Sequence, residues 1–240
     1  MSFLVKAAPA KKPAKSSKAL LIWRGVKDIW PKSVNHRHNG DGIFGTGTYY
    51  AISENTALQY ATGAIGLEDF KNFALVFGYS LTPKKPIELS PLDFSGLESG
   101  AFKLQVKSKE AAQKLKLFSG ERLEKSDLGN RAAAKGFDCI ILKSAKIDDD
   151  DWYMTEIDGD EQLLIPTASK LEPKLVEVDL VLRSDDEDFA EKVAKSLKTT
   201  VRDENELLIS IPLAKLSALQ KMLEEFVRNS ASDSDDDDDD

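Results

Sequence analysis

The stretch GTGTYYAIS at residues 45–53 joins a glycine-rich turn to an apolar strand and then to a helix start. Gly45 and Gly47 permit a tight turn. Ser53 is a good N-cap for a helix over residues 56–61. The stretch is not a P-loop, because no Gly-Lys-Ser/Thr follows, and it is not a Rossmann fingerprint, because a strand stands where a helix should. It predicts either a wall on which Tyr49 stacks against a flat ligand or a hairpin turn with core tyrosines.

Upstream, ALLIWRGV at residues 19–26 has the apolar run of a buried strand. Arg24 at its end needs an anionic partner, because an uncompensated buried guanidinium is costly. That partner is either a ligand or one of the chain's many acidic side chains. Gly25 would let a ligand approach the backbone.

Downstream, DEQLLIP at residues 160–166 places a glutamate at the mouth of an apolar strand. Glu161 is therefore a candidate catalytic acid, although a solvated strand end has the same pattern. A shift of one residue would put Gln162 at that position. Glu156, in a strand predicted over residues 152–157, is a further candidate.

These segments occur in a fixed order: Arg-Gly, then Gly-x-Gly-x-Tyr-x-Ala with a helix containing Ala57 and Tyr60, then GFDCI at residues 136–140, then Glu-x-Leu-Leu-Ile-Pro. This order resembles the ADP-ribosyltransferase superfamily over residues 19–172. The arginine is similar to that of the toxin branch, and the tyrosine motif to that of the poly(ADP-ribose) polymerase branch. The resemblance implies an α+β fold with a split β-sheet core, helices and an NAD site.

The resemblance also implies roles for individual residues. Arg24 would bind a phosphate or the adenosine ribose of NAD, and the Gly25 backbone would hold the nicotinamide amide. Tyr49 would stack on nicotinamide. Glu161 would hydrogen-bond the ribose 2′-hydroxyl and stabilise the oxocarbenium-like cation. The remaining NAD-binding positions would be Gly45, Gly47, Thr48 and Tyr60.

The implied activity is mono-ADP-ribosyl transfer from NAD to a protein acceptor, with release of nicotinamide and without a metal. Two alternatives stay open. One is transfer to a nucleic acid, and the other is a non-catalytic ADP-ribosyltransferase-like domain that acts as a binding or structural module.

Residues 173–230 lie outside the resemblance. Their pattern predicts a β-α-β-α module that is either a second domain or an extension of the first. Its elements are strands over 175–182 and 206–211 and helices over 185–197 and 214–227. In the first part we also predict strands over 73–81, 86–89 and 137–142, and helices over 108–118 and 121–135 with Gly136 as C′ glycine.

Charge is concentrated at the two ends of the chain. Residues 1–18 carry five lysines and no acid, and predict a disordered basic arm. Residues 231–240 predict a disordered acidic tail, whose seven aspartates account for most of the formal net charge of −8. The tail is a solubilising segment or a bait for a basic partner. The roughly balanced remainder argues against a dedicated DNA-binding domain, so contact with nucleic acid would come from the arm.

Three further features predict little chemistry. Cys139, the only cysteine, lies in an apolar run and is interpreted as a small core residue. His36 and His38 make a poor metal site but could contact NAD. The aspartate run at 148–151 lacks EF-hand spacing and indicates a solvated loop. No run approaches membrane-spanning length. We therefore expect a protein of the cytoplasm, or of a host's cytoplasm if it is a pathogen's effector.

Overall fold

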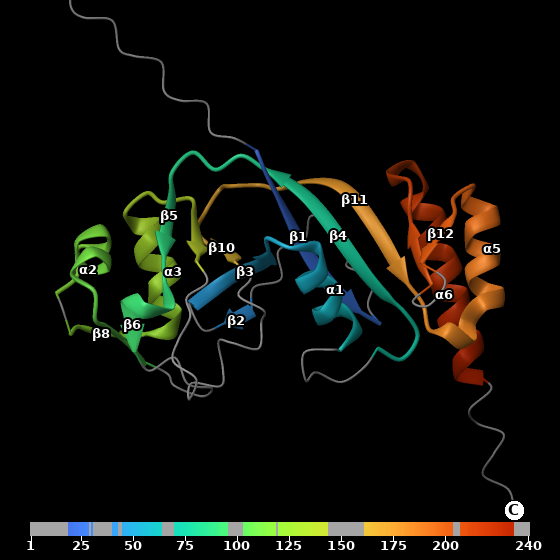
Figure 1. The fold of residues 1–240 in the computed structure, drawn as a ribbon, viewed down its shortest axis with the longest axis horizontal. Helices are drawn as coiled ribbons and strands as arrows, with labels where there is room; N and C mark the ends of the chain where they lie inside the picture. Colours follow the sequence, from blue (N-terminus) through green and yellow to red (C-terminus); the bar gives the residue numbers. More distant parts are fainter. Residues whose placement is uncertain are drawn as a thin grey trace, which may run out of the picture.

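The computed structural model describes residues 19–28, 30, 40–42, 45–63, 70–95, 103–118, 120–143, 161–203 and 207–232. These residues form an α+β fold with one large mixed sheet, one small sheet and covering helices (Figure 1). The predictions for the arm at 1–18, for residues 233–240 of the tail, for the aspartates at 148–151 and for the strand at 152–157 lie outside the described residues, as do His36, His38 and Glu156.

The large sheet has the strand order β12-β13-β11-β4-β1-β3-β10-β9-β5, and β2 also pairs with β3. All its described ladders are antiparallel except β5 with β9, which is parallel. The strands are β1 Leu20–Lys27, β2 Gly40–Gly42, β3 Gly45–Ala51, β4 Ala74–Leu81, β5 Pro86–Leu89, β9 Cys139–Leu142, β10 Gln162–Pro166, β11 Lys174–Val181, β12 Val201–Asp203 and β13 Leu208–Ser210. The sequence predictions are confirmed for β1, β4, β5, β9 and β11 to within two residues at each end.

The small sheet was not predicted. It has the order β6-β7-β8, with β6 Phe94–Ser95, β7 Lys103–Val106 and β8 Arg122–Glu124. The predicted helix over 121–135 was wrong at its start, because Leu123 pairs with Leu104 of β7 and the helix begins at residue 125. Its end is confirmed: Gly136 has a φ of 79° and stands just after the helix.

The helices are α1 Glu54–Thr62, α2 Lys109–Leu115, α3 Lys125–Ala134, α5 Glu187–Leu197 and α6 Leu216–Ser232. Ser53 caps α1 as predicted, because its side chain accepts a hydrogen bond from the Thr56 N–H. Among the residues that the structure describes, no helix combines the length and the apolar content needed to cross a membrane.

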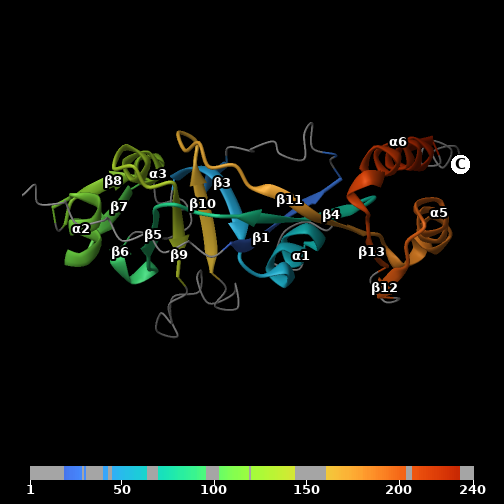
Figure 2. The same cartoon turned by 90° about the horizontal axis from the view of Figure 1, so that it is seen from above.

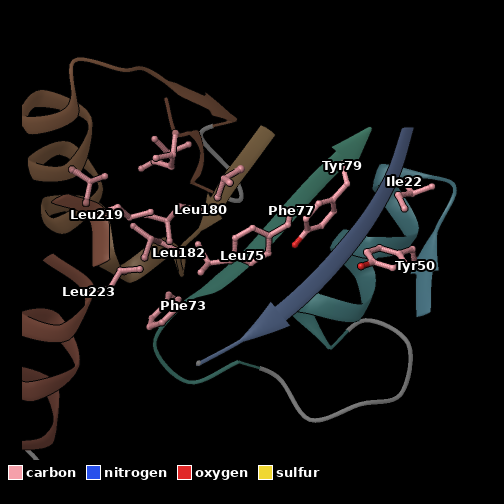
Figure 3. Packing of buried hydrophobic residues seen from close by; sticks show 14 of the residues in the cluster. Ile22, Tyr50, Phe73, Leu75, Phe77, Tyr79, Leu180, Leu182, Leu219 and Leu223 are labelled. Carbon is pink, nitrogen blue, oxygen red and sulfur yellow. The ribbon is translucent and has the colours of Figure 1, made fainter. Parts of the chain in front are cut away.

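The C-terminal module continues the large sheet. β11 pairs with β4 over its whole length, and β13 pairs with β11. The rings of Phe189 on α5 and Phe226 on α6 stack with centroids 4.1 Å apart. One buried cluster runs from Leu219 and Leu223 of α6 through the sheet to Tyr50 (Figure 3). The module therefore shares a core with strands β1, β3, β4, β9 and β10.

Candidate functional site

The segments that carry Arg24 and Tyr49 meet where the strand pairing changes. β1 pairs with β4 from Leu20 to Lys27, but its ladder with β3 consists of the single pair Trp23–Ala51. On the same edge of β3, residues 45–47 pair with β2. Residues 48–50 lie between these two ladders, and the antiparallel direction aligns them with residues 24–26 of β1, to which no ladder joins them. Strand β3 thus changes its partner from β1 to β2 at the two segments that the sequence analysis singled out.

The third segment lies directly beside them. Gln162 of β10 pairs with Ala51, which extends the row of paired residues from Trp23 across three strands. The Ile52 N–H donates a hydrogen bond of 3.0 Å to the Glu161 carbonyl oxygen. The structure therefore brings the backbones of the three predicted motifs together on neighbouring strands.

Side-chain direction separates Gln162 from Glu161. Because paired residues of neighbouring strands point to one face, Gln162 shares a face with Trp23 and Ala51. On that face the Tyr60 hydroxyl hydrogen-bonds the Gln162 side chain. Burial raises the pKa of Tyr60, and the bond to Gln162 partly offsets that shift. Tyr60, a predicted site residue, therefore lies beside position 162, and the alternation of the strand sends the Glu161 side chain the other way.

Glu161 is held by a lysine that sequence reasoning missed. The Lys143 ammonium lies 2.8 Å from Glu161 Oε1 and donates a 3.0 Å hydrogen bond to Oε2. Both side chains remain about a third exposed, at 39% and 34%. The hydrogen bond to Glu161 raises the pKa of Lys143, and the charge of Glu88 adds to this against the opposing effect of burial. The only signal in the sequence was the position of Lys143, one residue after the predicted strand over 137–142.

Tyr49 and Arg24 already have intramolecular contacts. The Tyr49 hydroxyl donates a 2.8 Å hydrogen bond to the carbonyl of Gly45, whose φ of 107° requires glycine. Arg24 lies across from Phe77 on the face that also carries Ile22 and Tyr79. Burial raises the pKa of Tyr79, and the nearby charge of Arg24 opposes the rise. Both residues are thus half-buried groups with defined positions.

The glycines of the two motifs have a packing role. A Cβ on Gly25 would lie 2.1 Å from the carbonyl oxygen of Ala57, so glycine lets α1 approach β1 closely. A Cβ on Gly47 would lie 2.5 Å from the carbonyl oxygen of Ile165 in β10. At Gly25 and Gly47 we expected open space for a ligand. The space into which a Cβ would project is instead filled by the chain's own backbone.

Cys139 is buried, with no exposed surface, which confirms its interpretation as a core residue. Burial raises the pKa of its thiol to about 12, with a further contribution from Asp138. A neutral, inaccessible thiol is a poor nucleophile.

Within the described residues no three His, Cys, Asp or Glu side chains are grouped so as to hold a metal ion. The comparison with protein-family models gives no match, and the comparison with curated proteins gives none either.

Proposed function

We propose that this chain binds NAD and transfers its ADP-ribose to a protein acceptor, with release of nicotinamide, on an ADP-ribosyltransferase-like split sheet. One observation carries the proposal. Arg24-Gly25 and Thr48-Tyr49-Tyr50 face each other where β3 changes partner from β1 to β2, one paired row from Glu161. These are the segments for which the family resemblance implies contact with the dinucleotide.

Alternation from the Trp23–Ala51 pair puts the side chains of Arg24 and Thr48 on one face of the sheet and the ring of Tyr49 on the other, so a dinucleotide that used all three would contact both faces where β1 and β3 part. The Thr48 hydroxyl is buried and forms no hydrogen bond within the described part of the chain. A buried polar group of this kind is normally satisfied, and a ligand amide or hydroxyl would satisfy it. Arg24 supplies a planar fork of donors that suits a diphosphate. The ring of Tyr49 is half-buried, with its hydroxyl anchored to Gly45, so its orientation is fixed before nicotinamide binds.

In the proposed reaction the bond between ribose C1′ and nicotinamide breaks, and its electron pair leaves with nicotinamide. The acceptor nucleophile then forms the new bond to C1′ and loses its proton. The Glu161 carboxylate would stabilise the positive charge that develops on the ribose. Lys143, which contacts both carboxylate oxygens, would hold the carboxylate in place, and a further lone pair of either oxygen would accept a hydrogen bond from the 2′-hydroxyl. Removing one such electrostatic contact typically costs about 10²- to 10³-fold in rate.

A second candidate, a non-catalytic NAD-binding module, is favoured by the directions of the side chains. Gln162 points to the face of Tyr60, whereas Glu161 is occupied by Lys143. If position 162 is the one that faces the ribose, a neutral amide stands there. An amide can hydrogen-bond a hydroxyl but carries no charge to stabilise a cation.

A set of three proteins separates these candidates. Wild type, Glu161→Gln and Gln162→Glu are incubated with NAD labelled in the adenylate. Nicotinamide release is followed by chromatography, and label transfer to total cell protein on gels. For the transferase we expect release by wild type, loss of about 10²-fold or more in Glu161→Gln, and no gain in Gln162→Glu.

For the module we expect NAD binding without release by wild type, and release that appears in Gln162→Glu. If none of the three proteins binds NAD although the two variants unfold at the same temperature as wild type, both candidates are contradicted.

A further inference from the structure

The small sheet presents an outward face of polar and basic side chains. β7 buries Leu104 and Val106, so Gln105 and Lys107 point outward by alternation. Arg122 of β8 pairs with Gln105 and is exposed beside it. This face lies away from the core that the two leucine-rich strands share with α2 and α3.

Carboxylates accompany some of the cations on this face: Glu121, next to Arg122, accepts a hydrogen bond from the Phe118 N–H and pairs with Arg131. Lys103 is 3.2 Å from Glu124, its cross-strand partner. Lys107 and Arg122 are exposed, and neither forms an ion pair with a carboxylate in the part of the chain that the structure describes. Two positive charges are therefore available to an external anion.

An exposed aromatic ring stands near the end of β7, between α2 and β8. The side chain of Phe118 is 84% exposed. The turn that carries it is fixed against β7, because Gly120 N–H donates a 2.7 Å hydrogen bond to Val106 O and Gln105 Nε2 reaches the Gly120 carbonyl at 3.5 Å. Gly120, two residues after Phe118, is therefore anchored to β7, and the Phe118 ring is exposed.

The surrounding charge is segregated along the molecule. Residues 103–135 contain nine Lys and Arg against four Asp and Glu, whereas the described residues 174–203 and 207–232 contain nine against ten. The two regions lie at opposite ends of the fold, with α2 and β8 at one end and α5 and α6 at the other (Figures 1 and 2). The formal net charge of −8 hides the basic stretch at residues 103–135, and for that reason composition gave no sign of a basic surface.

We propose that this basic strip, made of Lys103, Gln105, Lys107, Arg122 and Phe118, binds single-stranded nucleic acid. Phosphates would lie on Lys107 and Arg122, and a base would stack on the Phe118 ring. From Lys103 to Lys107 the chain rises about 13 Å in extended form, enough for a short stretch of single-stranded backbone. The proposal does not rest on the NAD site, since β7 and β8 contribute none of its residues.

Two other anionic partners fit less well. Readout of a duplex uses an element that enters a groove, and here the surface is the flat face of two short strands. An acidic peptide would pair with the cations but would leave the Phe118 ring in water. Bases have a face for that ring, so a single strand uses both features.

The test is fluorescence anisotropy of the full-length chain with labelled dT12 and rU12, and with a 12-base-pair DNA duplex. The variants are Lys107→Ala/Arg122→Ala and Phe118→Ala. The matched controls are Lys195→Ala/Lys221→Ala, which removes two exposed lysines at the acidic end, and Leu92→Ala, which removes an apolar side chain that is 61% exposed.

We expect the double variant to bind either single strand about tenfold more weakly at low salt and to lower the salt slope by about 1.4, at ~0.7 per phosphate contact. Phe118→Ala should also weaken binding about tenfold. The controls should bind like wild type, and all variants should keep the wild-type thermal unfolding midpoint. The relative affinities for dT12 and rU12 identify the kind of strand.

Equal binding by wild type and both strip variants would overturn the proposal and would assign any affinity to residues 1–18. Tighter binding of the duplex than of the single strands would also overturn it. The proposal would also be overturned if an acidic peptide with the sequence of residues 232–240 bound wild type as tightly as dT12 does.

Discussion

Substitution of Gly25 by alanine tests whether this glycine serves packing or ligand access. The new Cβ would meet Ala57 O at 2.1 Å, Ala61 Cβ at 2.8 Å and Ala61 N at 2.9 Å. Two of these atoms belong to the backbone of α1, so no side-chain rotation relieves the overlap. The helix would have to move by about 1 Å to restore ordinary contact, and a gap of that size forfeits roughly a quarter to a half of each dispersion contact along the interface.

Overpacking of this kind costs about 1–3 kcal/mol. Because the clash is with backbone, we place Gly25→Ala near the upper end, at about 2–3 kcal/mol of lost unfolding free energy. At ~2–4 °C per kcal/mol for a chain of this size, the thermal midpoint should fall by about 5–10 °C. Urea unfolding followed by circular dichroism, together with a thermal melt, measures both quantities.

The matched control is Gly129→Ala in α3. There the new Cβ would have one close neighbour, Thr46 O at 3.1 Å, and the next atoms are at 3.8 Å. The gain in helix propensity of about 1 kcal/mol offsets that contact, so stability should stay within about 1 kcal/mol of wild type. If Gly25→Ala unfolds like wild type but loses NAD affinity, the packing explanation is refuted and ligand access is the reason for the glycine.

Three further predictions concern single contacts. Lys143→Met should change the thermal midpoint by less than about 3 °C, because a half-exposed ion pair contributes under ~1 kcal/mol. Nicotinamide release by Lys143→Met should nevertheless fall, whereas Lys143→Arg should retain it. Equal release by Lys143→Met and wild type would show that Lys143 does not orient Glu161. Cys139 stays protonated when folded, with a pKa of about 12 against 9 unfolded, so its contribution to stability is complete below pH 9 and is lost as pH rises toward 12. Relative to Cys139→Ala, wild type should therefore lose up to ~1.4 kcal/mol per pH unit above pH 9 in urea titrations, and parallel pH profiles would contradict this. Gly78→Ala places a Cβ 2.6 Å from the Trp23 ring and should cost about 1–3 kcal/mol; in a Trp23→Leu background the cost should shrink, and an unchanged cost in this double-mutant cycle would rule out the ring as its cause.

The sequence predicted the elements whose apolar pattern is long or strict. β4 and β11 have eight residues each; the first was predicted from its apolar run and the second from the alternation of apolar and polar residues. The small sheet was missed because β6, β7 and β8 have two to four residues each and gain stability from pairing with one another. Such short segments show no periodicity that distinguishes a strand from the start of a helix.

For the candidate site, the sequence predicted which segments matter but not how their side chains are arranged. The motif order named Arg24, Tyr49 and Glu161, and the structure brings their strands together. It could not predict the Lys143–Glu161 pair, because that contact depends on the register between β9 and β10. The same register sends Gln162 toward Tyr60, and a shift of one residue would exchange the two faces.

The most direct test of the central claim is amide hydrogen exchange with and without NAD. If the dinucleotide lies between β1 and β3, NAD should slow exchange at residues 24–25 and 48–52 and leave β13, at the far side of the sheet, unchanged. Protection confined to other segments, or no protection at saturating NAD, would contradict the account.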